Sequence, residues 1–194
     1  MEDKGRHRPG CGTSGKSLWQ LLKFILVSGL AGIIQLALAN LLPLVFDGIT
    51  TAIPGMLRWA FRPERLFDRG TVQGAADYAR YVVNGAVSWG YVLPFFLSNA
   101  IANVYGYFQN KKTTFRSNAP KRNFVIYFAI LAVLILVSTW LQGVVFAWVN
   151  AAFHAPLILR LARTIAAAAA GLLQLIILYP LEKFVLLKSS TQSA

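Results

Sequence analysis

The sequence predicts an all-α integral membrane bundle of four transmembrane helices, with the N and C termini in the cytoplasm. Three observations lead to this fold class: an apolar composition, four long apolar runs and an uneven distribution of basic residues. Hydrophobic residues make up 56% of the 194 positions and charged residues only 13%, about half of the ~25% in an ordinary soluble domain. Lipid is therefore the expected solvent for most of the chain.

Four apolar runs are long enough to cross a bilayer. They cover residues 18–46, 81–108, 124–153 and 157–187, and a helix needs about 20 residues to span the hydrocarbon core. Because the runs are continuously apolar rather than alternating, they predict helices and not the strands of a β-barrel. Together they form one predicted membrane domain, residues 18–188. The polar residues 1–17 are expected to be a disordered basic tail, and residues 189–194 a second short tail.

Basic residues predict the orientation of the bundle. Five of them, and no acid, lie between the second and third runs, and more lie at both ends of the chain. Cytoplasmic loops of membrane proteins carry the excess of Lys and Arg, so these regions are expected on the cytoplasmic side of the cell membrane. The segment 47–80 then lies outside. Its mixture of aromatic residues and arginines suits either a helix on the membrane surface or a plain solvated loop.

Residues 10–17, GCGTSGKS, match the phosphate-loop pattern G-x-x-x-x-G-K-[ST]. A working phosphate loop follows a strand and opens a helix of an α/β domain. Only nine residues precede Gly10, and the segment after Ser17 is an apolar run. We interpret the match as a coincidence and expect no nucleotide at this motif.

Polar side chains inside the runs follow helical faces. One face of the second run collects Asn84, Ser88, Asn99, Asn103, Gly106 and Asn110. Such residues either hold helices together or line a path for a ligand, and both interpretations stay open. The arginines of the fourth run suit a phosphate at the outer end or simple snorkelling to the interface. The predicted substrate-binding residues are Gln35, Asn99, Asn103, Asn110, Lys111, Lys112, Arg160, Arg163 and Gln174.

The usual signatures of an enzyme are missing from the sequence. The chain has two histidines and one cysteine, and no two carboxylates lie where they could perform acid–base chemistry inside the membrane. No catalytic residue, metal or cofactor is predicted. These features favour a transporter or an interaction module.

The segment ANVYGYFQNKKTTF, at the end of the second run, resembles the GtrA-like family, whose second helix ends in a pattern like N-x-x-x-N-[RK]-x-x-[TV]-F. Asn110, Lys111, Thr114 and Phe115 fit the later part of that pattern, whereas Gly106 stands where the first Asn is expected. Family members repeat this ending in the fourth helix. In this chain the counterpart is YPLEKFVLL, in which Glu182 and Lys183 replace the Asn-basic pair.

The resemblance implies translocation of a polyprenyl-phosphate-linked sugar across the cytoplasmic membrane, for cell-surface polysaccharide synthesis. The amides would then line the path, Lys111 and Lys112 would receive the phosphate inside, and Arg160 and Arg163 would receive it outside. The implied partners are membrane lipid, the lipid-linked sugar and a membrane glycosyltransferase, and no nucleic acid. Because four helices make a thin bundle for so large a head group, a homo-oligomer is also expected.

Two other functions stay open. A scaffold could recruit or regulate a glycosyltransferase without transporting anything. A small proton-coupled exporter of cationic drugs also has four spans, but its mechanism needs a carboxylate embedded in the membrane. None of the four runs carries an acid near its middle, and this argues against the exporter.

Overall fold

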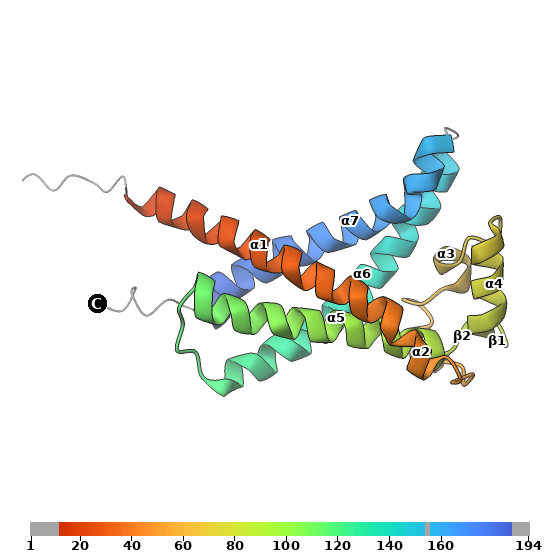
Figure 1. Ribbon diagram of the computed structural model, residues 1–194, viewed down its shortest axis with the longest axis horizontal. Helices are drawn as coiled ribbons and strands as arrows, with labels where there is room; N and C mark the ends of the chain where they lie inside the picture. Colours follow the sequence, from red (N-terminus) through yellow and green to blue (C-terminus); the bar gives the residue numbers. More distant parts are fainter. Residues whose placement is uncertain (1–11, 154–155, 188–194) are drawn as a thin grey trace, which may run out of the picture.

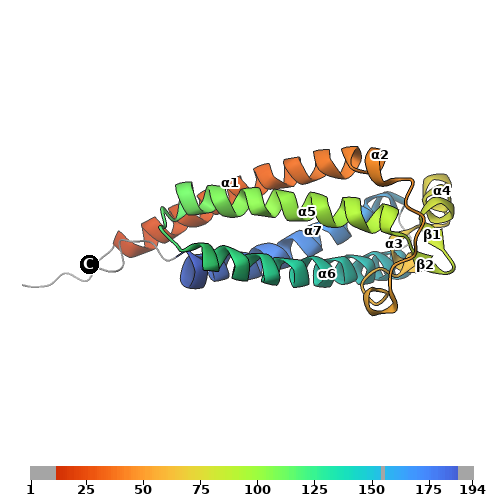
Figure 2. The ribbon, with the colours of Figure 1, turned by 90° about the horizontal axis from the view of Figure 1, so that it is seen from below.

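The computed structural model describes residues 12–153 and 156–187. Four long helices lie together in one elongated bundle (Figures 1 and 2): α1 (Gly12–Leu41), α5 (Trp89–Gln109), α6 (Lys121–Ala152) and α7 (Pro156–Pro180). Helix α1 packs mainly against α5, and α6 packs mainly against α7. The bundle is therefore built from two helical hairpins.

Three helices in the described residues are long and apolar enough to cross a membrane: Leu18–Phe46, Lys121–Ala152 and Thr164–Leu186. Their outward side chains are apolar, as lipid requires, and Leu26, Leu36 and Ile176 expose 64%, 67% and 64% of their surface. The predicted helical membrane fold is confirmed at this level. Helix α5 is not among the three, because its amides, serine and glycines make it less apolar than the others.

The second run forms a helix later than the sequence predicted. The strands β1 (Val82–Val83) and β2 (Ala86–Val87) pair antiparallel before α5 begins at Trp89. Between them Asn84 and Gly85 adopt φ values of 50° and 72°, and two positive φ angles characterise the type I′ turn that Asn-Gly favours. The prediction that Asn84 and Ser88 belong to the polar face of this helix was therefore wrong, because both residues precede it.

The segment 47–80 folds into a small cap at one end of the bundle (Figure 1). A short helix, α2 (Pro43–Phe46), leads into it. The cap itself consists of a 3₁₀ turn, η1 (Gly55–Leu57), and the helices α3 (Pro63–Leu66) and α4 (Val72–Tyr81).

The cap has a hydrophobic core of its own. Ile53, Phe61 and Phe67 are at most 3% exposed and pack with Val87 and Val92 of the hairpin and α5. An ion pair joins Arg80 of α4 to Asp47, the first residue of the cap, directly after α2. The structure therefore differs from both interpretations of this segment, a surface helix and a solvated loop.

Two π-helical turns continue the second helix of each hairpin. Helix α5 runs into η2 (Asn110–Thr114), and α7 runs into η3 (Leu181–Leu186). Both turns lie at the end of the bundle opposite the cap (Figure 1). Such π-helical segments occur frequently at functional sites.

The motif at residues 10–17 does not form a phosphate loop where it is described. Residues 12–17, including Lys16 and Ser17, already belong to helix α1, so their backbone N–H groups point along a helix instead of wrapping a phosphate. The helix thus begins six residues before the predicted boundary at Leu18. Gly10 lies outside the described residues.

Candidate functional site

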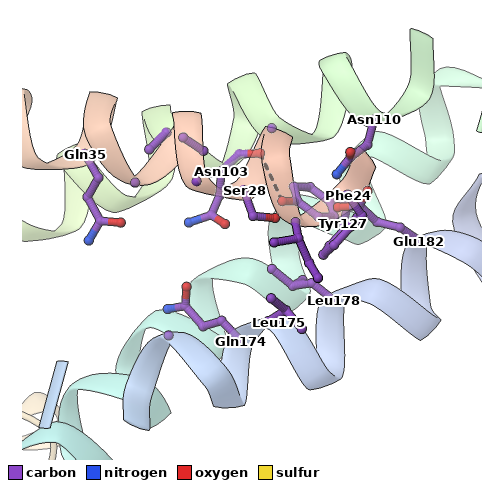
Figure 3. Close-up of a pocket in the computed structure, with 17 residues that line it drawn as sticks. Phe24, Ser28, Gln35, Asn103, Asn110, Tyr127, Gln174, Leu175, Leu178 and Glu182 are labelled. Carbon is purple, nitrogen blue, oxygen red and sulfur yellow. Dashed lines mark hydrogen bonds between the residues drawn. The ribbon is translucent and has the colours of Figure 1, made fainter. Parts of the chain in front are cut away.

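A cavity whose mainly apolar lining carries several polar side chains lies between α1, α5 and α7. Its volume is about 360 Å³. Gln35 (α1), Asn103 (α5) and Gln174 (α7) line one part of it, and Glu182 (η3) lies at the opposite side, near Tyr127 of α6 and Asn110 (Figure 3). We call it the inner cavity. Gly29, Gly32, Gly106 and Gly171 also line it, and their missing side chains keep the space open.

Two smaller cavities continue from the inner cavity toward the cap. The first, of about 200 Å³, shares Gln35, Gly171 and Gln174 with it and adds Asn99 and Gln142. The second, of about 130 Å³, shares Gln142 and ends at Arg65 of the cap. Shared lining residues make the three cavities neighbours. We call these three separate, neighbouring cavities the polar lane; Glu182 lies at one end of it and Arg65 at the other.

The amides of the lane are held in defined positions. The side-chain N–H groups of Asn99 and Asn103 donate to Phe95 O (3.2 Å) and Asn99 O (2.9 Å) on their own helix. Gln174 Nε2 donates to Ser138 Oγ at 3.1 Å, which links α7 to α6. The hydroxyl of Tyr127 donates to Asn103 O at 3.0 Å. Each bond from an amide uses one of the two N–H donors of that amide, so every one of these amides keeps one N–H donor and its oxygen acceptor for a ligand.

Most of the predicted amides lie together in the lane. Gln35, Asn103, Asn110 and Gln174 line the inner cavity, and Asn99 lines the next cavity. This arrangement agrees with the polar helical faces that the sequence indicated.

The predicted cations are placed differently. Lys111 donates from Nζ to Ala119 O at 2.6 Å and so fastens the connection between α5 and α6. Lys112 is exposed, away from the lane. The backbone of Arg160 and Arg163 belongs to the first half of α7, but their side chains lie outside what the structure describes.

Two charged residues of the lane were not among the predicted site residues. Arg65 comes from the cap, and its side chain passes over Gly143 of α6, where an added Cβ would lie 3.0 Å from Arg65 Cβ. No sequence signal marks this pairing, because it joins distant segments. Glu182, by contrast, lies on the same helical stripe as Gln174, and this spacing could have identified it.

The position of Glu182 bears on the sequence argument against the proton-coupled exporter. The exporter was disfavoured because no run carries an acid near its middle. Glu182 lies near the inner end of the span Thr164–Leu186 but is only 2% exposed and lines the inner cavity. A carboxyl group does therefore face the lane. In the described residues no group of three or more His, Cys, Asp or Glu side chains could hold a metal ion.

The apolar helices and the internal polar lane define the chain as a multi-pass α-helical membrane protein. No protein family, curated protein or solved structure matches the chain in the comparisons that were made.

Proposed function

We propose that this protein translocates a polyprenyl-phosphate-linked sugar across the cytoplasmic membrane, in the manner implied by its resemblance to the GtrA-like family. The observation that carries the proposal is the polar lane. A sugar head group needs neutral hydrogen-bonding partners in place of water while it crosses the hydrocarbon core. The amides of Gln35, Asn99, Asn103 and Gln174 offer such partners from three helices, and the prenyl tail can stay in lipid.

The proposal includes a fourth membrane span. Helix α5 has 21 residues, which at 1.5 Å per residue gives about 30 Å, the thickness of the hydrocarbon core. It also lies beside α1 in both views (Figures 1 and 2), and α1 is a membrane-spanning candidate. With α5 inserted, the basic connection between α5 and α6 lies on the cytoplasmic side and the cap lies outside.

The phosphate of the substrate needs a cation near each end of the lane. At the outer end Arg65 is half-buried and lines the last cavity, and a guanidinium binds phosphate through a planar pair of N–H donors. We add Arg65 to Arg160 and Arg163 as the outer phosphate ligands. Lys111 already donates to Ala119 O, and the exposed Lys112 does not line the lane, so we propose that Lys112 meets the phosphate outside it, at the membrane surface.

Purified protein in liposomes tests the translocase. A fluorescent polyprenyl-phosphate sugar is followed as it leaves the outer leaflet, with empty liposomes and a Gln35→Leu, Gln174→Leu double variant alongside. A variant at the exposed Asn118 serves as the matched control. We expect fast movement that the double variant loses and the control keeps. No movement above empty liposomes, with protein that elutes as a folded species, would contradict the proposal.

One observation favours the scaffold as a second candidate. The cap is a folded unit, yet Met56 and Trp59 on its surface are 78% and 43% exposed. Exposed apolar side chains on a rigid element suit a protein partner. If a glycosyltransferase docks there, Met56→Ser and Trp59→Ser should abolish its co-purification, whereas changes in the lane should not.

A further inference from the structure

Glu182 is the one described acid whose side chain is buried in the lane. It is 2% exposed, and its Oε2 atom has no hydrogen-bond partner. The carboxyl group points toward the inner cavity, with the amide of Asn110 beside it (Figure 3). No Lys or Arg of the described residues forms an ion pair with it.

A carboxyl group in this position needs a positive partner or a proton. Burying an ionised carboxylate without compensation is very costly. A buried acid is therefore either paired with a cation or protonated, and it can alternate between these two states. The amide of Asn110 supplies at most a neutral contact. Glu182 also lines the inner cavity, so an occupant of the cavity lies beside this side chain, whose Oε2 atom is buried there.

We propose that the inner cavity binds a sugar that carries a protonated amine, with the ammonium group paired to Glu182. That this sugar is the head group of a transported lipid rests on the proposed function. The cation site at Glu182 does not depend on that function. The lining fits this class of ligand. Gln35, Asn103 and Gln174 offer hydrogen bonds to hydroxyl groups, and the rings of Phe24 and Tyr127 add aromatic surface. At about 360 Å³ the cavity lies within the usual range of small-molecule sites, roughly 300–1,000 Å³.

The simplest competing occupant is a proton alone. In that case Glu182 would be a neutral structural group beside Asn110, and the cavity would not distinguish an amine from a hydroxyl. The two interpretations differ in one measurable property, the selective protection of Glu182 by an amine.

Chemical modification of the wild-type protein tests the site. Dicyclohexylcarbodiimide modifies protonated carboxyl groups in apolar surroundings, and peptide mass spectrometry locates the adduct. The full-length protein, in lipid nanodiscs, is labelled with and without an alkyl glycoside of 2-amino-2-deoxyglucose. The alkyl glucoside with the same chain, which has a hydroxyl in place of the amine, is the matched ligand. Glu64 of the cap is exposed, outside the apolar surroundings that the reagent needs, and is the negative control for the selectivity of labelling.

We expect the amino glycoside to slow modification of Glu182 at least about tenfold more than the neutral glycoside does, a difference of about 1.4 kcal/mol in binding. Modification of Glu64 should not change. Equal protection by both ligands, or no modification of Glu182 at any pH from 5 to 8, would overturn the proposal. Because this test uses only the wild-type protein, a folding defect in a variant cannot affect its result.

The liposome experiment separates this inference from the proposed function. Selective protection without lipid movement would support the amine site and contradict the translocase. Lipid movement without selective protection would support the translocase and contradict the amine site.

Discussion

The two helical hairpins of the bundle end in the same backbone geometry but carry different chemistry at the same point. In the first hairpin Phe115 N donates to Asn110 O at 2.9 Å, and in the second Leu187 N donates to Glu182 O at 2.7 Å. Both bonds close a π-helical turn, and Asn110 and Glu182 are each 2% exposed. The two residues therefore occupy corresponding positions in two π-helical turns of the same geometry.

The difference lies in the residue four positions later. In the first hairpin Thr114 Oγ1 donates to Asn110 Oδ1 at 3.0 Å, so the buried amide has a local partner. In the second hairpin the same place is taken by Leu186, which is apolar and buried, and Oε2 of Glu182 stays without a partner. One hairpin thus satisfies its buried polar group internally, and the other leaves it facing the cavity.

Gly106→Leu should have the largest effect, because it makes the first hairpin resemble the second, where the corresponding cavity residue is Leu178. Gly106 lines the inner cavity, and a leucine there would fill space that a head group needs. We expect the movement of lipid-linked sugar in liposomes to fall to the rate of empty liposomes. Gly106→Ala is the control, because its Cβ would meet only Ala31 Cβ at 3.7 Å, an ordinary contact. Equal rates in wild type and Gly106→Leu would contradict this role of the cavity.

Glu182→Gln places a neutral amide at both corresponding positions. We expect this substitution to have the second-largest effect. We expect the preference for an amine-bearing head group over its N-acetylated form to fall by about tenfold or more, because the ion pair is lost. The thermal unfolding temperature should stay the same or rise, because a buried acid without a partner is replaced by a neutral group. A variant that keeps the full preference would show that Glu182 does not touch the head group.

Asn110→Ala removes the amide that lies between Thr114 and Glu182. The loss leaves two buried polar groups without their partner, and we expect the free energy of unfolding to fall by about 1–3 kcal/mol. Unfolding in mixed micelles measures this change. The exposed Asn118 provides the comparison, because Asn118→Ala should change stability by no more than about 0.5 kcal/mol. Equal effects of the two substitutions would show that the buried amide is not held by its neighbours.

Thr114→Val keeps the shape of the side chain and removes only the hydroxyl group, so it should have the smallest effect. The expected loss of stability is about 1 kcal/mol, the usual net value of one hydrogen bond. Thr113→Val is the control, since the hydroxyl of Thr113 is exposed. In the Asn110→Ala background Thr114→Val should cost much less, because the bond is already absent. Additive losses would mean that the two side chains act independently.

The sequence predicted the apolar helices well and the irregular segments poorly. The predicted third run, residues 124–153, corresponds to α6 at Lys121–Ala152, because a long apolar helix depends only on its own composition. The prediction for the second run, residues 81–108, was wrong at its start, because α5 begins only at Trp89. Asn84-Gly85 is a strong turn signal, yet the apolar residues on either side of it were assigned to the helix.

The sequence predicted only the part of the candidate site that depends on spacing within one helix. Helical spacing alone brings Asn99 and Asn103 to one face, and the structure places them in the lane. The same spacing could not place Arg65, which reaches the lane only because the cap folds back onto α6 beside Gly143. Nor could it show that Glu182 is buried, since this depends on how η3 packs within the bundle.

The sequence by itself determined the solvent and the secondary structure of this protein. Transfer of a helix into lipid is a sum over its own side chains, so composition and run length were sufficient. Only the tertiary structure decided which polar groups meet. Asn110 has a local partner in Thr114, whereas Glu182 faces amides contributed by α1 and α5. Where a buried polar group has no local partner, as for Glu182, the groups it meets are distant in the chain, and packing alone brings them together.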